Sequence, residues 1–396
     1  MAAVVQGETS VRFVPDLATD RLVFRLWPNG PRSSRSGARL EVATFTVDGK
    51  PIATELRDPT TLVVRPASGL VARRAVEISM TWRLALPRAS DDRVSLDVVA
   101  GSPSVRLGSF FPILAWEPGF GWATEPPVAG FAEASTATTA DFDLTVGAPA
   151  GFDVLASGVN DRPGHWTAVA MRDVAVSVGR FQTASAVARA PHPIDVKVGV
   201  HAGVGERPDV YLRKVVAALE DFGRRFGPYP WPTFTLAVTP ELGGGIEYPG
   251  HVMQGPGTQG RTTSHEVGHQ WFYGLVGNDQ GRDPWLDEGL ATWAELQFEG
   301  GVTALPGFSV PAPGRGRVGE PMTYWDPRDY AYYRSVYVQG AQALAALGRP
   351  DLVDCALRVY VAANAHRIAR PADLVAAAGA VFPDAAATLA PFGVRP

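Results

Sequence analysis

The segment HEVGH, His265 to His269, has the residue types and spacing of a zinc-binding helix. Histidines at positions i and i+4 lie on one face of an α-helix, so both imidazoles can reach one ion. Neutral imidazole nitrogens are common zinc ligands. Glu266 follows the first histidine, where its carboxylate can reach a water on the metal without binding the metal itself. The pattern predicts a zinc site with its own proton acceptor; the alternative is an amphipathic helix with two surface histidines.

A third candidate ligand follows His269 after eighteen residues, at Glu288 in WLDEGLATWAE. A second helix that carries this carboxylate can fold back on the first and complete a set of two histidines and one glutamate. Such a set leaves a fourth position open for water, as catalytic zinc sites do. We therefore expect one Zn²⁺ per chain. Glu295 lies two helical turns after Glu288 and is predicted to bind a ligand histidine; the alternative is an exposed helix glutamate.

The stretch ELGGGIEYPG, Glu241 to Gly250, places bare backbone directly before a single acid, Glu247. Gly244 and Gly245 would let a peptide approach closely and pair with the chain as an added strand. We predict an edge strand here, next to the zinc helix. The alternative is a Gly-rich turn with a solvent-facing acid. His251, which follows this stretch, is interpreted as a loop histidine that binds no metal.

Taken together, HEVGHQWFYGLV followed by PWLDEGLATWAE resembles the aminopeptidase N and leukotriene hydrolase family of zinc peptidases. FGPYPWP, from Phe226, resembles the entry to that family's catalytic domain. GGGIEYPG stands where the family has its Gly-x-Met-Glu-Asn motif, and YVQGAQAL, from Tyr337, resembles its Tyr-x-Lys-Gly-Ala segment. The resemblance spans both halves of the chain and is sharp between Phe226 and Ala343. It implies a gluzincin: a thermolysin-like catalytic domain behind a saddle-shaped β domain.

Carried over to this sequence, the resemblance implies a role for each matched residue. His265, His269 and Glu288 would bind zinc, and Glu266 would be the general base that later returns its proton to the leaving amine.

The same resemblance implies three residues that contact the substrate. Tyr337 would donate a hydrogen bond to the oxyanion, Glu247 would bind the free amino group of the first residue, and Tyr332 matches a second tyrosine of some members. For both tyrosines the alternative is an aromatic helix face in the core.

The sequence departs from the family pattern at several positions. Tyr248 stands where relatives carry an asparagine, so a substrate-backbone contact would be missing or made by a phenol. Gln339 replaces the lysine of Tyr-x-Lys-Gly. In the first domain no glutamine matches the residue that helps hold the amine in relatives; Glu117 is the nearest candidate, and a surface glutamate is the better interpretation. No counterpart of the relatives' C-terminal helical domain follows, so a short form with a more open cleft is expected.

The elements that must position these residues change in character along the chain. Before residue 204, short alternating stretches such as VEISMTWRLAL and IDVKVGVHAG are separated by turn residues, which predicts an all-β domain over residues 1–203. After it, the apolar spacing of PDVYLRKVVAALEDFGRRF, and of the segments 263–274, 285–298, 336–347, 351–363 and 372–382, predicts helices. With the predicted strand FTLAVTPEL, residues 204–396 form an α+β, mainly helical catalytic domain.

Composition restricts the partners and the class. Hydrophobic residues make up 46% of the 396 residues and the net charge is −4, which suits a globular protein and gives no sign of a nucleic-acid partner. No apolar run reaches the roughly 18 residues of a membrane-spanning helix. The N-terminus lacks the pattern of a secretory signal; VVQGETSVRF resembles a strand already under way, which leaves cytoplasmic and secreted locations open. The oligomeric state is not predicted.

These observations predict a zinc metallopeptidase, with an aminopeptidase acting on peptides as the leading function. Two alternatives stay open: an endopeptidase or another amide or epoxide hydrolase with the same site, and a zinc-bearing binding module without turnover.

Overall fold

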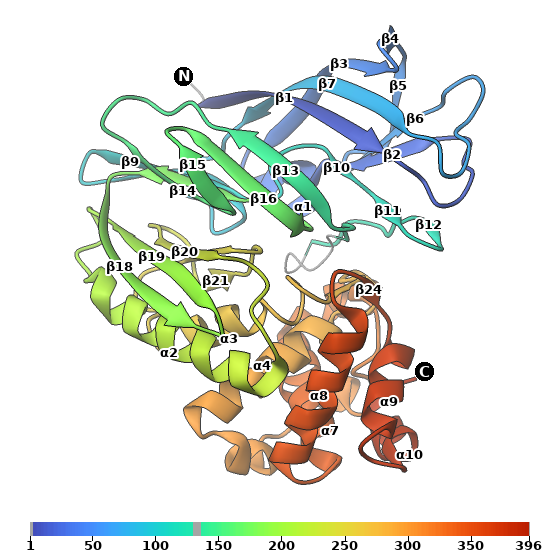
Figure 1. The fold of residues 1–396 in the computed structure, drawn as a ribbon, viewed down its shortest axis with the longest axis vertical. Coiled ribbons are helices and arrows are strands. Elements are labelled where there is room, and N and C mark those ends of the chain that lie inside the picture. Colours follow the sequence, from blue (N-terminus) through green and yellow to red (C-terminus); the bar gives the residue numbers. More distant parts are fainter. Residues whose placement is uncertain (1–2, 130–135, 396) are drawn as a thin grey trace.

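The structure is a computed structural model that describes residues 3–129 and 136–395. Its N-terminal part consists mainly of antiparallel strands, and its C-terminal part consists mainly of helices (Figure 1). A mixed sheet lies between the two, with its helices on the side away from the N-terminal strands. The predicted change from strands to helices along the chain is therefore confirmed.

The N-terminal part contains several small sheets. One has the order β1 (Val4–Phe13), β7 (Val76–Ala85), β3 (Arg39–Val47), β4 (Lys50–Pro51), and a second has the order β10 (Ile113–Leu114), β2 (Leu22–Arg25), β6 (Thr61–Val64), β5 (Thr54–Asp58). The others are β13 (Ala140–Thr145), β16 (His165–Met171), β15 (Val159–Arg162); β14 (Asp153–Ala156), β17 (Val176–Gly179), β9 (Ser102–Leu107), β8 (Val94–Val99); and the pair β11 (Trp116–Glu117), β12 (Gly121–Trp122).

Alternation of buried and exposed side chains explains why these segments form strands. In β7, Val76, Ile78, Met80, Trp82 and Leu84 point to one side and are buried, while their neighbours are more exposed. This period of two is the pattern of a sheet with one face in the core. The buried faces of the N-terminal sheets pack into one apolar core.

A five-stranded sheet carries the elements of the predicted site. Its order is β18 (Phe181–Arg189), β19 (Pro193–His201), β20 (Thr233–Val238), β22 (His251–Gln254), β21 (Gly245–Ile246). β19, β20 and β22 run parallel, and β18 and β21 are antiparallel edge strands. The sheet therefore crosses the boundary that the sequence places at residue 204, because the hairpin of β18 and β19 pairs with β20 and not with the preceding strands.

Helices follow the sheet in the order α2 (Pro208–Phe226), α3 (Arg261–Gly268), α4 (Trp285–Glu299), α5 (Met322–Trp325), α6 (Asp329–Tyr333), the π-helix η5 (Arg334–Val338), α7 (Gln339–Ala346), α8 (Pro350–Asn364), α9 (Pro371–Gly379), α10 (Ala385–Leu389). α1 (Pro31–Arg35) lies in the N-terminal part, and the pair β23 (Gly277–Asn278) and β24 (Ile368–Ala369) joins the loop after α3 to the segment after α8. α2 buries Leu212, Val215, Leu219 and Phe222 in the core of the helical part.

Two predicted helices differ from the observed ones around the site. The helix expected over 263–274 ends at Gly268, because the next turns are wider: the Gly274 N–H bonds to the His269 carbonyl, 2.8 Å away, and the next two N–H groups bond five residues back in the same way. The helix expected over 336–347 begins with the π-helical turn η5, which contains Tyr337. Isolated π-helical turns occur often at functional sites.

α4 and α7 pack against each other through two glycines. A Cβ on Gly340 would lie 2.8 Å from the Cα of Gly289, and a Cβ on Gly289 would lie 3.1 Å from the Cα of Gly340. The absence of both side chains lets the two backbones approach closely. Gly289 directly follows Glu288, so this contact sets how closely η5 and α7 approach the predicted metal ligand.

Within residues 3–129 and 136–395, no helix combines the length and the apolar composition needed to cross a membrane.

Candidate metal centre and peptide site

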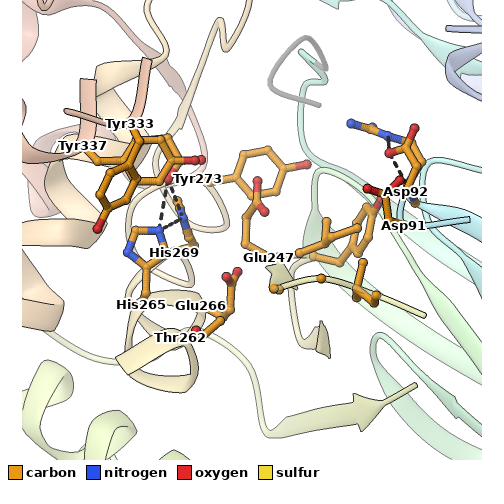
Figure 2. Close-up of a pocket in the computed structure, with 18 of the residues that line it drawn as sticks. Asp91, Asp92, Glu247, Thr262, His265, Glu266, His269, Tyr273, Tyr333 and Tyr337 are labelled. Atoms are coloured by element: carbon orange, nitrogen blue, oxygen red, sulfur yellow. Dashed lines mark hydrogen bonds and ion pairs between the residues drawn. The ribbon is translucent and has the colours of Figure 1, made fainter. Parts of the chain in front are cut away.

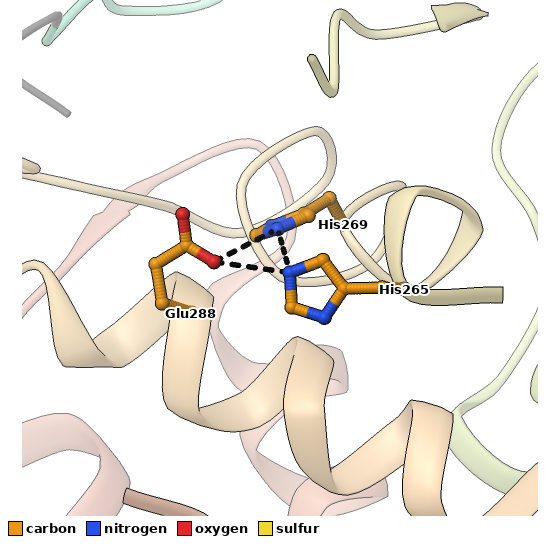
Figure 3. Close-up of side chains that lie close together, drawn as sticks. All are labelled: His265, His269 and Glu288. Carbon is orange, nitrogen blue, oxygen red and sulfur yellow. Dashed lines mark hydrogen bonds and ion pairs between the residues drawn. The ribbon is translucent and has the colours of Figure 1, made fainter. Parts of the chain in front are cut away.

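The three predicted ligands lie together between two packed helices (Figure 3). His265 is on α3, His269 directly follows it, and Glu288 lies in the first turn of α4. The Nε2 atoms of the two histidines are 3.1 Å apart, and each lies within 3.3 Å of the Glu288 Oε2 atom. Ligand atoms about 2.0–2.1 Å from a tetrahedral zinc lie about 3.3 Å from one another. The observed triangle therefore has the size of three zinc ligands.

Each histidine uses its other nitrogen to hold its ring in place. The His269 Nδ1–H donates to the carbonyl of Phe272 at 3.0 Å, so its Nε2 is free to bind a cation. The His265 Nδ1 lies 3.4 Å from the Glu295 carboxylate, which also binds Arg261. Glu295, which the sequence predicts to bind a ligand histidine, thus lies beside His265, and it is buried rather than exposed. Such contacts fix the tautomer and the direction of a metal-binding imidazole.

Glu266 lies beside this triangle with a free carboxylate oxygen. The side chain is buried, and among the described residues its Oε2 has no hydrogen-bond partner. Burial, together with the nearby carboxylates, outweighs the two histidines and raises the pKa of Glu266 to about 8. A buried acceptor without a partner inside the protein fits a group whose partner is a water or a substrate. The residues present therefore fit a zinc ion with a neighbouring base.

The glycine stretch lies directly against Glu266. Gly245 belongs to the edge strand β21, as predicted, and a Cβ on it would lie 2.4 Å from the Glu266 Oε1 atom. Gly244 has a φ of +131°, a conformation that residues with side chains rarely adopt. The missing side chains thus serve two needs: the turn into β21 and the space for the Glu266 carboxylate.

Glu247 faces the same space (Figure 2). One ligand-type atom each from Glu247, Glu266 and His269 lie within 4.8 Å of one another. This group does not make a second, independent metal site, because the His269 Nδ1 is bound to Phe272 and only Nε2 is left for both groups. Glu247 is instead a separate carboxylate within a few ångströms of the predicted base.

Tyr337 packs flat on a predicted ligand. Its ring stacks on that of His265 with a centroid distance of 5.6 Å and an interplanar angle of 15°. Tyr332 is buried and contacts the Tyr337 ring edge-on at 5.7 Å, and Tyr333 packs on it at 5.0 Å. Tyr333 is a pocket residue that the sequence did not suggest. Tyr332, Tyr333 and His265 thus hold the Tyr337 ring next to the three predicted zinc ligands.

Tyr248, at the position where a family resemblance expects an asparagine, packs beside Ile246 of the edge strand at the contact with the N-terminal part, and it is one of the residues that line the pocket of the site. A Cβ on Gly108 would lie 2.0 Å from its hydroxyl oxygen. The ring is buried near Ala175 and Met253, and its hydroxyl has no hydrogen-bond partner among the described residues. The backbone carbonyl of Tyr248 accepts a hydrogen bond from Gln270 at 3.2 Å.

A cavity of about 330 Å³ joins these residues and extends to the N-terminal part of the chain. Four of its lining residues, Arg32, Asp91, Asp92 and Arg93, come from that part, and Arg32 and Asp91 form an ion pair at 2.7 Å. Sequence reasoning missed them, because nothing in their local pattern indicates which distant motif they face.

Tyr273 also lines the cavity and was not predicted. Its φ of +123° is rare for a residue with a side chain, and in Figure 2 its ring lies beside Glu247. The wide turn after α3 places it there, and the sequence gives no local signal for that turn.

Two secondary interpretations from the sequence are wrong. Glu117 is buried, not on the surface: it binds Arg370 and lies 3.7 Å from Arg282, which brings charges of both parts together. His251 is not a loop residue; it begins strand β22, is fully buried and contacts Ser177 and Thr235. Both errors have the same cause, because burial of these polar side chains depends on partners far away in the sequence.

No protein-family sequence model matches the chain. Several solved structures are similar to the chain in fold. An M1 zinc metallopeptidase from Deinococcus radiodurans, a variant bound to the substrate Tyr-Ser-Ala, has a TM-score of 0.71 at 19% identity, over 99% of this chain and 91% of that chain. A two-domain M1 zinc metallopeptidase variant bound to L-tryptophan gives 0.71 at 19% identity, over 98% and 90% of the two chains. One bound to L-arginine gives 0.68 at 18% identity, over 99% and 91%. Over nearly its whole length, the chain is therefore similar in fold to the two-domain M1 zinc metallopeptidases.

Proposed function

We propose that the protein is a zinc-dependent aminopeptidase that removes the first residue of peptides. The observation that carries this proposal is the short distance between Glu247 and Glu266, whose carboxylates belong to one group of atoms within 4.8 Å. One extended residue spans roughly 3.3–3.6 Å. A peptide whose amino group binds Glu247 would have only one residue before the bond next to Glu266.

His265, His269 and Glu288 would hold one zinc ion per chain. A bound zinc ion supplies Lewis-acid chemistry, which polarises a carbonyl and lowers the pKa of water to about 7. The size of the ligand triangle and the restrained imidazoles support this assignment. The fold neighbours, which are zinc metallopeptidases, support it independently.

Glu266 would take a proton from the attacking water and return it to the leaving amine. Its Oε2 atom, which has no hydrogen-bond partner in the part of the chain that the structure describes, and its burial next to Gly245 support this role. Tyr337 would donate a hydrogen bond from its hydroxyl to the oxyanion that develops on the carbonyl. Its stack on His265 restrains the ring next to a proposed zinc ligand, which supports a preorganised donor. Tyr332, which contacts the Tyr337 ring edge-on, would help to hold that ring on the side that faces the substrate.

The substrate would lie along the outer side of β21, where no other strand of the described residues pairs with it. Gly244 and Gly245 leave the backbone of this edge open to a peptide, and Glu247 ends the track by binding the cationic amino group. Because the Tyr248 ring packs against Gly108, we infer that it contributes no side-chain contact like that of an amide at this position. The bound Tyr-Ser-Ala and single amino acids of the fold neighbours support peptides as the substrate class.

We further propose that the chain has two domains, with the predicted limits 1–203 and 204–396 and a saddle-like first domain, except that the β18–β19 hairpin pairs with β20 and so belongs to the sheet of the second domain. The alternatives of an endopeptidase and of a binding module without turnover lack an explanation for Glu247 next to Glu266. For that reason the aminopeptidase is preferred.

Replacing Glu266 by glutamine tests the reaction directly. The variant keeps the size of the side chain and loses the base, so we expect zinc content near that of the wild type and a loss of nearly all hydrolysis. The measurement is turnover of a panel of aminoacyl fluorogenic substrates, with and without a chelator, next to zinc content by atomic absorption. Substantial turnover by a zinc-loaded Glu266→Gln protein would contradict the assigned role of Glu266.

A further inference from the structure

We propose that the buried side-chain amide of Gln280 positions Glu247 for binding the free amino group and thereby sets the preference for unblocked peptides. The inference rests on the proposed function, because it needs Glu247 as the amine anchor. Gln280 makes no contact with the substrate in this proposal and acts only through Glu247.

Gln280 joins two acidic side chains that belong to different segments. Its Nε2 atom donates to the Glu247 Oε1 atom at 3.3 Å and to the Asp287 Oδ2 atom at 2.8 Å. Gln280 is 2% exposed and Asp287 is fully buried. Since a side-chain amide carries two N–H donors on one nitrogen, both contacts can be made at once.

The orientation of the amide follows from these two contacts. With the amide turned over, its carbonyl oxygen would face the Glu247 carboxylate, and a carboxylate only accepts hydrogen bonds. Asp287 is itself held, because its Oδ1 atom accepts a hydrogen bond from the backbone N–H of Glu288 at 2.8 Å. Asp287 on α4 therefore holds the amide through one N–H, and the second N–H points at Glu247.

This arrangement ties the amine anchor to the metal centre. Asp287 and Glu288 are neighbours in the first turn of α4, so the helix that supplies a predicted zinc ligand also fixes Gln280. Glu247 lies on a different segment, just after β21, and is only partly buried. A long carboxylate side chain in such a place has several rotamers, and a binding group works best when its neighbours hold it in one of them.

The test compares free and N-acetylated forms of the aminoacyl fluorogenic substrate that the wild-type protein cleaves fastest. In Gln280→Met the side chain keeps its length and loses both donors. We expect the ratio of kcat/KM for free over acetylated substrate to fall about ten- to a hundredfold, the size of a lost charge-assisted contact. The change should appear as a higher KM for the free substrate, with kcat nearly unchanged and zinc content equal to that of the wild type.

A double-mutant cycle with Glu247→Ala separates positioning from mere stability. If Gln280 acts through Glu247, Gln280→Met changes nothing further in the Glu247→Ala background. Additive effects of the two changes would overturn the proposal. If Gln280→Met does not fold, Gln280→Asn, whose shorter side chain cannot keep both contacts, takes its place in the same cycle.

Gln342→Met is the matched control, because this amide also makes two contacts, to the carbonyls of Leu305 and Phe308 at 2.8 and 2.9 Å, and does not line the cavity. We expect it to lower the melting temperature and to leave the substrate ratio unchanged. A wild-type protein that cleaves both forms equally would contradict the proposed function itself. A wild-type preference that Gln280→Met retains would overturn only the role of Gln280.

Discussion

At the scale of single residues, the site brings together carboxylates whose surroundings differ. Glu288 faces two imidazoles, which outweigh burial and lower its pKa, whereas burial raises the pKa of Glu266 to about 8. A carboxylate that stays ionised suits a cation, and one with a raised pKa suits proton transfer near neutral pH. The pKa of Glu288 is therefore shifted down, which suits a metal ligand, and the pKa of Glu266 is shifted up, which suits a general base.

Tyr337→Phe tests the hydroxyl at this scale. The ring stack on His265 needs only the aromatic ring, so the variant should keep the fold and the zinc content. Losing one donor to an oxyanion typically costs about 10²–10³ in kcat. We expect a loss of this size in kcat with little change in KM, measured by steady-state kinetics. An unchanged kcat would assign Tyr337 to packing alone.

The histidines predict how zinc affinity depends on pH. Without a cation between them, burial lowers the pKa of His269, but the charge of Glu288 prevails and raises it to about 9. The metal-free site thus binds a proton below that pH, and zinc must displace it. Affinity should fall about tenfold for each pH unit and each displaced proton as the pH drops from 8 to 6. Competition with a chromophoric chelator measures this, and equal affinity at both pH values would refute it.

At the scale of elements, the distance between α4 and α7 decides whether Glu288 and Tyr337 face the same space. The contact between Gly289 and Gly340 leaves no room for a side chain. The wide turns after α3 and the π-helical turn η5 have a related effect, because they aim His269 and Tyr337 at the site. Irregular turns thus lie next to His269 on one side of the predicted metal centre and contain Tyr337 on the other.

Gly340→Ala tests this packing. Its Cβ would lie 2.8 Å from the backbone of Gly289, so the helices must move apart. Overpacking of this kind costs about 1–3 kcal/mol, and we expect a lower melting temperature together with lower kcat/KM. Gly379→Ala, at the end of α9 where the new Cβ meets no atom within 4 Å, is the control and should change neither quantity. Full activity of Gly340→Ala would show that the spacing of α4 and α7 is not critical.

At the scale of the whole molecule, buried side chains connect the strand-rich part to the segments of the site. Arg172, which directly follows β16, donates hydrogen bonds to the carbonyls of Gly274 and Leu275 in the turn after α3. Arg106 in β9 binds Asp97 at 2.7 Å and the carbonyl of Pro240 at 2.6 Å, just before the glycine stretch. The N-terminal part therefore positions the edge strand as well as lining the cavity.

Arg106→Met tests this connection. The change leaves Asp97 fully buried without its cationic partner, which costs about 3–5 kcal/mol. At roughly 2–4 °C per kcal/mol for a domain of this size, the melting temperature should fall by about 10 °C. Arg12→Met, which removes an exposed pair with Glu77 at 3.5 Å, should change it little. Equal melting temperatures for both variants would show that the buried contacts of Arg106, to Asp97 within the N-terminal part and to the carbonyl of Pro240, contribute little to stability.

The sequence by itself determined the strongest features of the site and the order of the elements. The i, i+4 spacing of His265 and His269 is a property of any helix, and alternating or helical periodicity separates strands from helices within a short window. For this reason the grouping of His265, His269 and Glu288, the edge strand at Gly245 and most helices were predictable. Local periodicity carries this information because it depends only on neighbours along the chain.

Only the tertiary structure decided which distant side chains meet. The bridge from Gln280 to Glu247, the burial of Glu117 and His251, and the reach of Asp92 into the cavity all join segments far apart in the sequence. The pairing of β19 with β20 likewise extends the five-stranded sheet before residue 204. These contacts depend on the register and packing of whole elements, and no short stretch of sequence records the partner that a side chain will find.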